Sequence, residues 1–133
     1  MIVVDTNIIA YLYLSSDRST QAEKALLKDP LWCAPLLWRS ELRNVLAHYL
    51  RKNILDLAEI QQIMGEASQL LQGREYMVTS QHVLRLVAGS TCSAYDCEFV
   101  ALAGDLGLHL ITTDKQILNQ FPNIAISLEE FVG

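Results

Sequence analysis

The chain has 133 residues, of which 51% are hydrophobic and 19% are charged, and its formal net charge is −5. This length predicts one domain, residues 1–133, that can bury a hydrophobic core without disulfides. The acidic balance excludes the broad basic face with which sequence-neutral nucleic-acid binders neutralise phosphates, so a nucleic acid would have to be held by metal ions and a local group of arginines.

The sequence also argues against secretion and membrane insertion. It has no run of roughly 20 apolar residues such as a membrane span requires, and residues 1–5 lack the basic and long apolar regions of a secretion signal. The three cysteines, Cys33, Cys92 and Cys97, form no CxxC pair. An odd number of unpaired cysteines is typical of buried thiols in a reducing compartment, and we therefore expect a cytoplasmic protein without membrane contact.

Short apolar segments alternate with amphipathic segments along the chain. In chain order they predict a strand at 2–4, helices at 8–14 and 20–29, a strand at 31–34, helices at 35–52 and 56–72, a strand at 76–79, helices at 81–88 and 93–106, a strand at 108–113, a helix at 114–121 and a strand at 124–126. Pro35 is expected in the first turn of its helix, where no N–H is needed, and Gly73 and Gly107 are expected to end the helices before them. The alternation, without hairpin turns, predicts an α/β fold with three layers around a parallel sheet of four to five short strands.

Two of these strands end in an aspartate, the first in Asp5 and the fourth in Asp114. Ligands bind at the carboxyl ends of parallel strands, and a first strand tends to lie centrally, so the two carboxylates are expected to meet. Glu41 and Asp96 lie on helices beside apolar faces, where a carboxylate is costly unless it is paired or binds a cation. Taken singly, however, the three aspartates also fit capping roles at helix N-termini, and Glu41 also fits a solvated helix position.

Four short motifs occur in order over nearly the whole chain. They are Val4-Asp5-Thr6-Asn7, Ser40-Glu41-Leu42-Arg43, Tyr95-Asp96-Cys97-Glu98-Phe99-Val100-Ala101-Leu102-Ala103 and Leu110-Ile111-Thr112-Thr113-Asp114. In content and separation this set resembles the PIN-domain family, and within that family it is most similar to the VapC-type toxins of bacterial toxin–antitoxin pairs. Any one motif is weak evidence, whereas the four together are specific.

The resemblance implies one catalytic site in which Asp5, Glu41, Asp96 and Asp114 bind Mg²⁺ or Mn²⁺. It implies that Asn7 and Thr112 touch the metal directly or through water, with turn capping as the alternative. Arg43 would contact RNA or a partner, or else be a solvated helix arginine. Other arginines that could guide an RNA loop are Arg39, Arg51, Arg74 and Arg85.

The activity implied by the resemblance is that of an endoribonuclease. It would cleave a structured RNA, such as a tRNA or rRNA, by attack of water on a phosphodiester, leaving a 5′-phosphate and a 3′-hydroxyl. The implied partners are a cognate antitoxin protein and a second copy of the chain in a homodimer.

Other functions fit the sequence less well. A phosphatase with an aspartate nucleophile needs a second acid where this chain has Asn7. A DNase or flap-type nuclease shares the chemistry but needs arch or clamp elements, for which 133 residues leave little room. A non-catalytic PIN-fold interaction module, or a PIN nuclease of RNA processing that is not a toxin, would keep the same motifs. Acyl transfer, NTP hydrolysis and dinucleotide binding lack their motifs, and His48, His82 and His109 are isolated.

Overall fold

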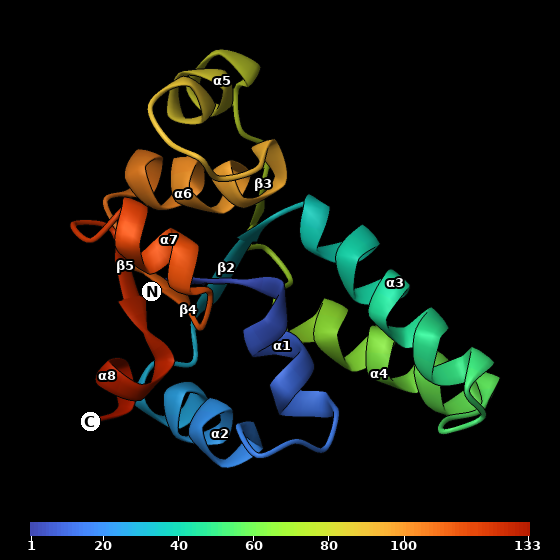
Figure 1. Ribbon diagram of the computed structural model, residues 1–133. Coiled ribbons are helices and arrows are strands. Elements are labelled where there is room, and N and C mark those ends of the chain that lie inside the picture. Colours follow the sequence, from blue (N-terminus) through green and yellow to red (C-terminus); the bar gives the residue numbers. More distant parts are fainter.

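A five-stranded parallel sheet forms the centre of the computed structural model, which describes residues 1–133 (Figure 1). The strands are β1 Ile2–Val4, β2 Trp32–Pro35, β3 Glu75–Tyr76, β4 Leu110–Thr112 and β5 Ala125–Ser127. Their order across the sheet is β3-β2-β1-β4-β5, and every neighbouring pair is parallel. As predicted, the first strand is central, and β4 pairs directly with it.

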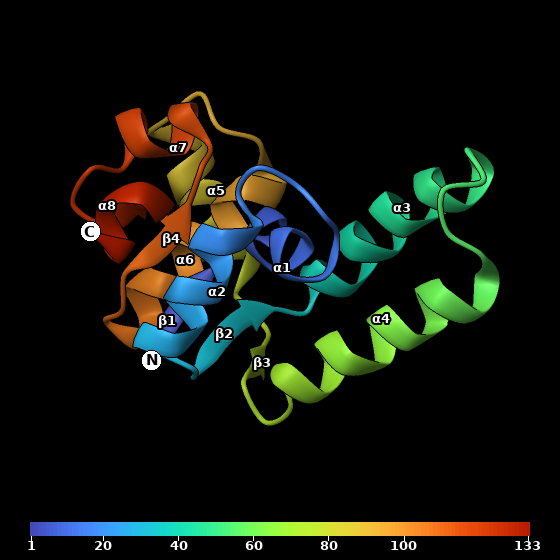
Figure 2. The same ribbon diagram turned by 90° about the horizontal axis from the view of Figure 1, so that it is seen from below.

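Eight helices surround this sheet. They are α1 Thr6–Tyr13, α2 Ser19–Lys28, α3 Leu37–Arg51, α4 Leu57–Leu70, α5 Ser80–Ala88, α6 Ala94–Leu106, α7 Lys115–Gln120 and α8 Leu128–Val132. Helices α5 and α6 lie on one side of the sheet and α1 and α2 on the other, which makes the three layers expected of an α/β fold (Figure 1). Helices α3 and α4 lie side by side and extend away from the sheet in both views (Figures 1 and 2). No helix is long and apolar enough to cross a membrane.

The core explains why the central strands and α6 are so apolar. Strands β1 and β4 are buried along their whole length, as expected for parallel strands covered on both faces. Helix α6 contacts β1, β2 and β4 on one side and α5 on the other. It is therefore buried around most of its circumference, which matches its nearly continuous apolar sequence. The three cysteines are free and buried, as predicted.

Two local predictions were wrong, and one helix was missed. Pro35 ends β2 instead of opening a helix. The N–H groups of Ala34 and Leu36 bond to β3, so the missing N–H of Pro35 faces the other side, where β1 has already ended. Gly73 does not cap α4, which ends at Leu70 with Leu71 as its C-cap, but it adopts a left-handed φ of 79° in the turn before β3. The short helix α8 follows β5 immediately and was not predicted.

Gly107 is the C-cap of α6, as predicted, with a φ of 65°. We expect Gly107→Ala to lower the free energy of unfolding by about 1–2 kcal/mol, because an L-residue is disfavoured in this conformation. Gly65 is the matched control, since it lies inside α4 with open space around it. Gly65→Ala should raise the free energy of unfolding by about 0.5–1 kcal/mol through helix propensity. Urea denaturation of both variants tests this, and a change of the same sign in both would contradict it.

Candidate active site

A cleft of about 240 Å³ opens at the carboxyl edge of the sheet, where β1 and β4 end. The four predicted acids come to it from four elements: Asp5 after β1, Glu41 on α3, Asp96 on α6 and Asp114 after β4. The residues that line the cleft are Asp5, Thr6, Asn7, Glu41, Asn44, Val45, Asp96 and Asp114. The topology therefore brings together carboxylates that are up to 109 residues apart in the numbering of the chain.

Asp5 is held in place by the last residue of the neighbouring strand. The Thr112 hydroxyl donates a hydrogen bond of 2.8 Å to Oδ2 of Asp5. The same Oγ1 accepts the backbone N–H of Asp114 at 3.0 Å. Thr112 is fully buried and does not line the cleft. Its hydroxyl thus joins the ends of β1 and β4, and it orients Asp5 from within the protein.

Glu41 is oriented in a similar way by a residue that the sequence analysis missed. The Thr6 hydroxyl donates a hydrogen bond of 2.7 Å to Oε1 of Glu41. Thr6 is buried, at 4% exposure, in the first turn of α1. Asn44 was missed as well, although it lies three residues after Glu41 on α3 and so shares its face. The spacing on α3 could have revealed Asn44, whereas no local signal connects Thr6 with Glu41.

Of the three aspartates that could instead serve as helix caps, Asp114 does so, whereas Asp5 and Asp96 do not. Oδ1 of Asp114 accepts the N–H groups of Gln116 and Ile117, at 2.8 and 3.1 Å, and so caps α7. Its Oδ2 makes no hydrogen bond in the structure. Ser93 caps α6 by accepting the N–H of Asp96, so the Asp96 carboxylate does not cap this helix, and it forms no ion pair. Asp5 precedes α1 but makes no side-chain capping bond.

The cluster is electrostatically unbalanced. None of the ion pairs in the structure involves one of the four acids. Burial raises the pKa of Asp5 to about 6, and the charges of Glu41 and Asp96 act in the same direction. Burial also raises the pKa of Glu41 and of Asp96, aided by the charges of Asp96 and Asp114 respectively. No lysine, arginine or histidine side chain pairs with these four acids to relieve their repulsion. The cleft therefore has affinity for protons or for an external cation.

Glu98 is a fifth acid that the sequence analysis did not single out. Burial raises its pKa, and the charge of Glu41 raises it further, so its carboxylate lies near the acidic cluster. It does not line the cleft itself but a neighbouring cavity. The sequence signal that could have identified Glu98 was its position two residues after Asp96.

Arg43 lies outside the acidic cleft. Its Nε donates to the Arg39 carbonyl at 3.0 Å, and its side chain borders a shallow cavity between α3 and α4. Arg39 itself forms a two-bond ion pair with Glu75, and Arg74 donates to two backbone carbonyls. Arg39 and Arg74 are therefore engaged in holding the fold, which corrects the expectation that they are available to guide RNA.

The donor set of the cleft fits a divalent cation, although no three acidic, histidine or cysteine side chains are arranged to hold one ion together in the structure. Carboxylates are hard oxygen ligands, and Mg²⁺ commonly binds through one or two of them while keeping several waters. The cleft has four carboxylates that are not paired with a basic side chain, which is more than the one or two that Mg²⁺ commonly needs. Asp5, Glu41, Asp96 and Asp114 are accordingly the residues that could hold a metal.

Comparison with known proteins agrees with this architecture. The PIN-domain family model matches residues 2–124. The chain belongs to the PIN-domain family. It is 30% identical over 124 residues to "Ribonuclease VapC3" of Pyrobaculum aerophilum, covering 91% of this chain and 95% of that protein. The family resemblance read from the four motifs is therefore confirmed.

Two solved structures share the fold of this chain. The crystal structure of PAE2754 from Pyrobaculum aerophilum has a TM-score of 0.77 at 18% identity, covering 98% of this chain and 85% of that one. A toxin–antitoxin complex from Klebsiella pneumoniae contains a chain with a TM-score of 0.72 at 17% identity, covering 96% and 98%. The predicted parallel α/β fold is thus confirmed at the level of the whole chain.

We expect Asp5→Asn to stabilise the metal-free protein at pH 8. The pKa of Asp5 rises from 3.8 to about 6 on folding, so ionisation of this acid destabilises the fold progressively as the pH increases between these values. The variant removes this penalty, which is about 2–3 kcal/mol at pH 8 and falls to about 0.5 kcal/mol near pH 4. Urea denaturation in EDTA at both pH values measures the difference.

Asp17→Asn serves as the control, because Asp17 is exposed in the loop between α1 and α2. It should change stability by less than about 0.5 kcal/mol at either pH. If Asp5→Asn were no more stable than the unmodified protein at pH 8, the claim that the buried, ionised Asp5 carboxylate destabilises the fold would be disproved.

Proposed function

We propose that this PIN-domain protein is a Mg²⁺- or Mn²⁺-dependent endoribonuclease whose catalytic and metal-binding residues are Asp5, Glu41, Asp96 and Asp114. The observation that carries the proposal is the convergence of four carboxylates from four elements on one cleft without a protein cation. The relative with 30% identity is named a ribonuclease, which agrees with this chemistry.

The reaction is hydrolysis of a phosphodiester. A water oxygen forms a bond to phosphorus, the bond from phosphorus to O3′ breaks, and O3′ takes up a proton, so that the products are a 5′-phosphate and a 3′-hydroxyl. A divalent cation, when bound, neutralises charge on the phosphate oxygens and lowers the pKa of a coordinated water. The carboxylates of the cleft hold the cation and accept hydrogen bonds from the attacking water.

Two buried hydroxyls prepare the carboxylates for this task. Thr112 holds one oxygen of Asp5 and Thr6 holds one oxygen of Glu41, so each acid keeps its second oxygen for a ligand. A site whose side chains are already oriented loses little entropy on binding its substrate. Asn7 and Asn44 add neutral amides at the exposed rim, where they can bond a metal-bound water or a phosphate oxygen without adding charge.

The substrate that suits this surface is a structured RNA with unpaired nucleotides, such as a tRNA or rRNA loop. A net charge of −5 does not favour tight binding of duplex phosphates. Loops and bulges can instead be recognised through their shape and exposed bases. Arg43, Arg51 and Arg85 are exposed and are the arginines left to contact phosphates or a partner protein.

The protein would act in the cytoplasm as the toxin of a toxin–antitoxin pair. Its similarity to a VapC ribonuclease and to a chain of a toxin–antitoxin complex supports this role. An antitoxin segment with a basic side chain would complement the unpaired carboxylates of the cleft and block metal and RNA together. A homodimer is part of the same proposal.

We expect Asp96→Asn to reduce RNA cleavage by roughly 100-fold or more. Asp96 is the best position for this test, because its carboxylate caps no helix and forms no ion pair, so its replacement should leave the fold intact. Purified proteins are incubated with total RNA in Mn²⁺ or in EDTA, and the new 5′ ends are mapped. Asp17→Asn is the matched control and should cleave normally. Undiminished, Mn²⁺-dependent cleavage by Asp96→Asn would contradict the assignment.

Metal binding can be tested without cleavage. Mn²⁺ should raise the melting temperature of the unmodified protein increasingly with concentration, because it binds the folded state only. The rise should be much smaller in Asp5→Asn, which loses a ligand of the cleft, and unchanged in Asp17→Asn. An equal rise in all three proteins would place the metal elsewhere, and the absence of any rise would favour a non-catalytic PIN-fold module.

A further inference from the structure

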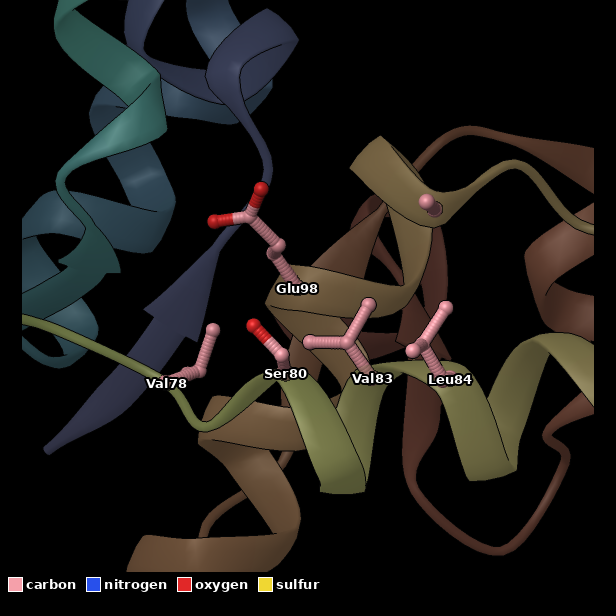
Figure 3. Close-up of a pocket in the computed structure, with 6 residues that line it drawn as sticks. Val78, Ser80, Val83, Leu84 and Glu98 are labelled. Carbon is pink, nitrogen blue, oxygen red and sulfur yellow. The ribbon is translucent and has the colours of Figure 1, made fainter.

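A second cavity, of about 360 Å³, lies next to the acidic cleft and has no part in the mechanism above. It lies between the segment that joins β3 to α5, the first turns of α5 and the first turns of α6. Its lining residues are Val78, Ser80, Val83, Leu84, Ala94 and Glu98. In Figure 3, Ser80, Val83 and Leu84 project from α5 in the same direction, and Glu98 extends from α6 with its carboxylate pointing away from Val83 and Leu84. The volume is within the range of pockets that bind small molecules.

The lining of this cavity has two chemical parts. Four aliphatic side chains, Val78, Val83, Leu84 and Ala94, make up its apolar part. The polar part consists of the Ser80 hydroxyl and the Glu98 carboxylate, neither of which has a hydrogen-bond partner in the protein. A ligand that fits both parts must combine an apolar face with a polar edge that carries N–H donors.

The cavity adjoins the catalytic residues through the first turns of α6. Ala94 and Glu98 are four residues apart and share one face of this helix. Asp96 of the acidic cleft lies in the same turn of α6, two residues from both Ala94 and Glu98, and therefore points to a different side of this helix. The Tyr95 side chain is 63% exposed, and Leu84 at the cavity is 60% exposed, although both are large apolar groups. A substrate that extends from the cleft around the first turn of α6 would reach the cavity.

We propose that this cavity binds an unpaired guanine base of the RNA next to the phosphate that is cut, an inference that rests on the proposed ribonuclease function. A nucleobase has apolar faces that pack on aliphatic and aromatic side chains, and a polar edge. The Watson–Crick edge of guanine presents the N1–H and N2–H donors side by side, which one carboxylate accepts together. The other three bases do not offer two adjacent donors on that edge.

The sign of the charge also favours a base over other parts of RNA. Glu98 lines the cavity and no basic side chain does, so a phosphate would be repelled from it, whereas a neutral base with N–H donors is attracted. A basic side chain from a protein partner would pair with Glu98, but its charged head would leave the four aliphatic side chains largely uncovered. The exposed Tyr95 ring offers a surface on which a neighbouring base can stack.

The first experiment needs no cleavage. The methyl groups of Val83, Leu84 and Ala94 are followed by NMR while guanosine 5′-monophosphate or uridine 5′-monophosphate is added to the metal-free protein. Because the two nucleotides share the same sugar and phosphate, a difference between them reports on the base. We expect the guanine nucleotide to shift these methyl signals at concentrations roughly tenfold lower than the uridine nucleotide. In Glu98→Gln this difference should disappear, whereas Glu23→Gln, an exposed change on α2, should retain it.

Equal shifts with the two nucleotides, or none with either, would overturn the proposal. A short arginine-containing peptide is titrated in parallel, and shifts caused by the peptide but not by the guanine nucleotide would identify a protein ligand and overturn it as well.

The second experiment uses a single-stranded RNA pool of random sequence with Mn²⁺. Guanine should be enriched at one fixed position beside the cleavage site, and Glu98→Gln should lower this enrichment roughly tenfold, while Glu23→Gln should leave it intact. Cleavage without any guanine enrichment would overturn the base pocket and leave the ribonuclease function standing. Absence of cleavage would overturn the ribonuclease function, and the NMR titration would then decide the base pocket by itself.

Discussion

The pairing of β1 with β4 is the contact on which the rest of the site depends. The N–H of Asp5 donates to the Ile111 carbonyl at 3.0 Å, which extends the ladder to the residue that carries the carboxylate. One residue later on β4, the Thr112 hydroxyl holds that carboxylate and also accepts the N–H of Asp114. The ends of two central strands, two acids and the start of α7 are therefore joined by three hydrogen bonds. A shift of this register would separate the acids.

The hydrogen bonds at the cleft orient the acids without neutralising them. Thr6 and Thr112 are uncharged donors, so Glu41 and Asp5 keep their full charge when ionised. Burial then raises the pKa of both acids, and the protein tolerates this penalty because a core of 29 buried apolar residues stabilises the fold. In our proposal a cation offsets this unfavourable burial, which is the usual compromise between stability and activity.

The distribution of charge also explains how an acidic protein can act on RNA. Arg39 and Arg74 hold the β2–β3 side of the sheet through Glu75 and backbone carbonyls, so they do not form a phosphate-binding face. Recognition in our proposal relies instead on a metal ion in the cleft and on a base in the neighbouring cavity. Both contacts are short-ranged and depend on unpaired nucleotides, which suits a nuclease that must choose one RNA loop rather than bind nucleic acid generally.

The amino-acid sequence by itself determined the α/β class, the PIN-domain family and the end of α6 at Gly107, and it singled out the four acids that line the cleft. These features depend on signals within a few residues, such as periodicity, caps and short motifs. Only the tertiary structure decided that Thr6 orients Glu41, that Thr112 joins Asp5 to Asp114, that Pro35 ends a strand, and that Glu98 faces a separate cavity. Each of these depends on contacts between segments far apart in the chain, and strand order and helix packing, rather than local propensity, bring such segments together.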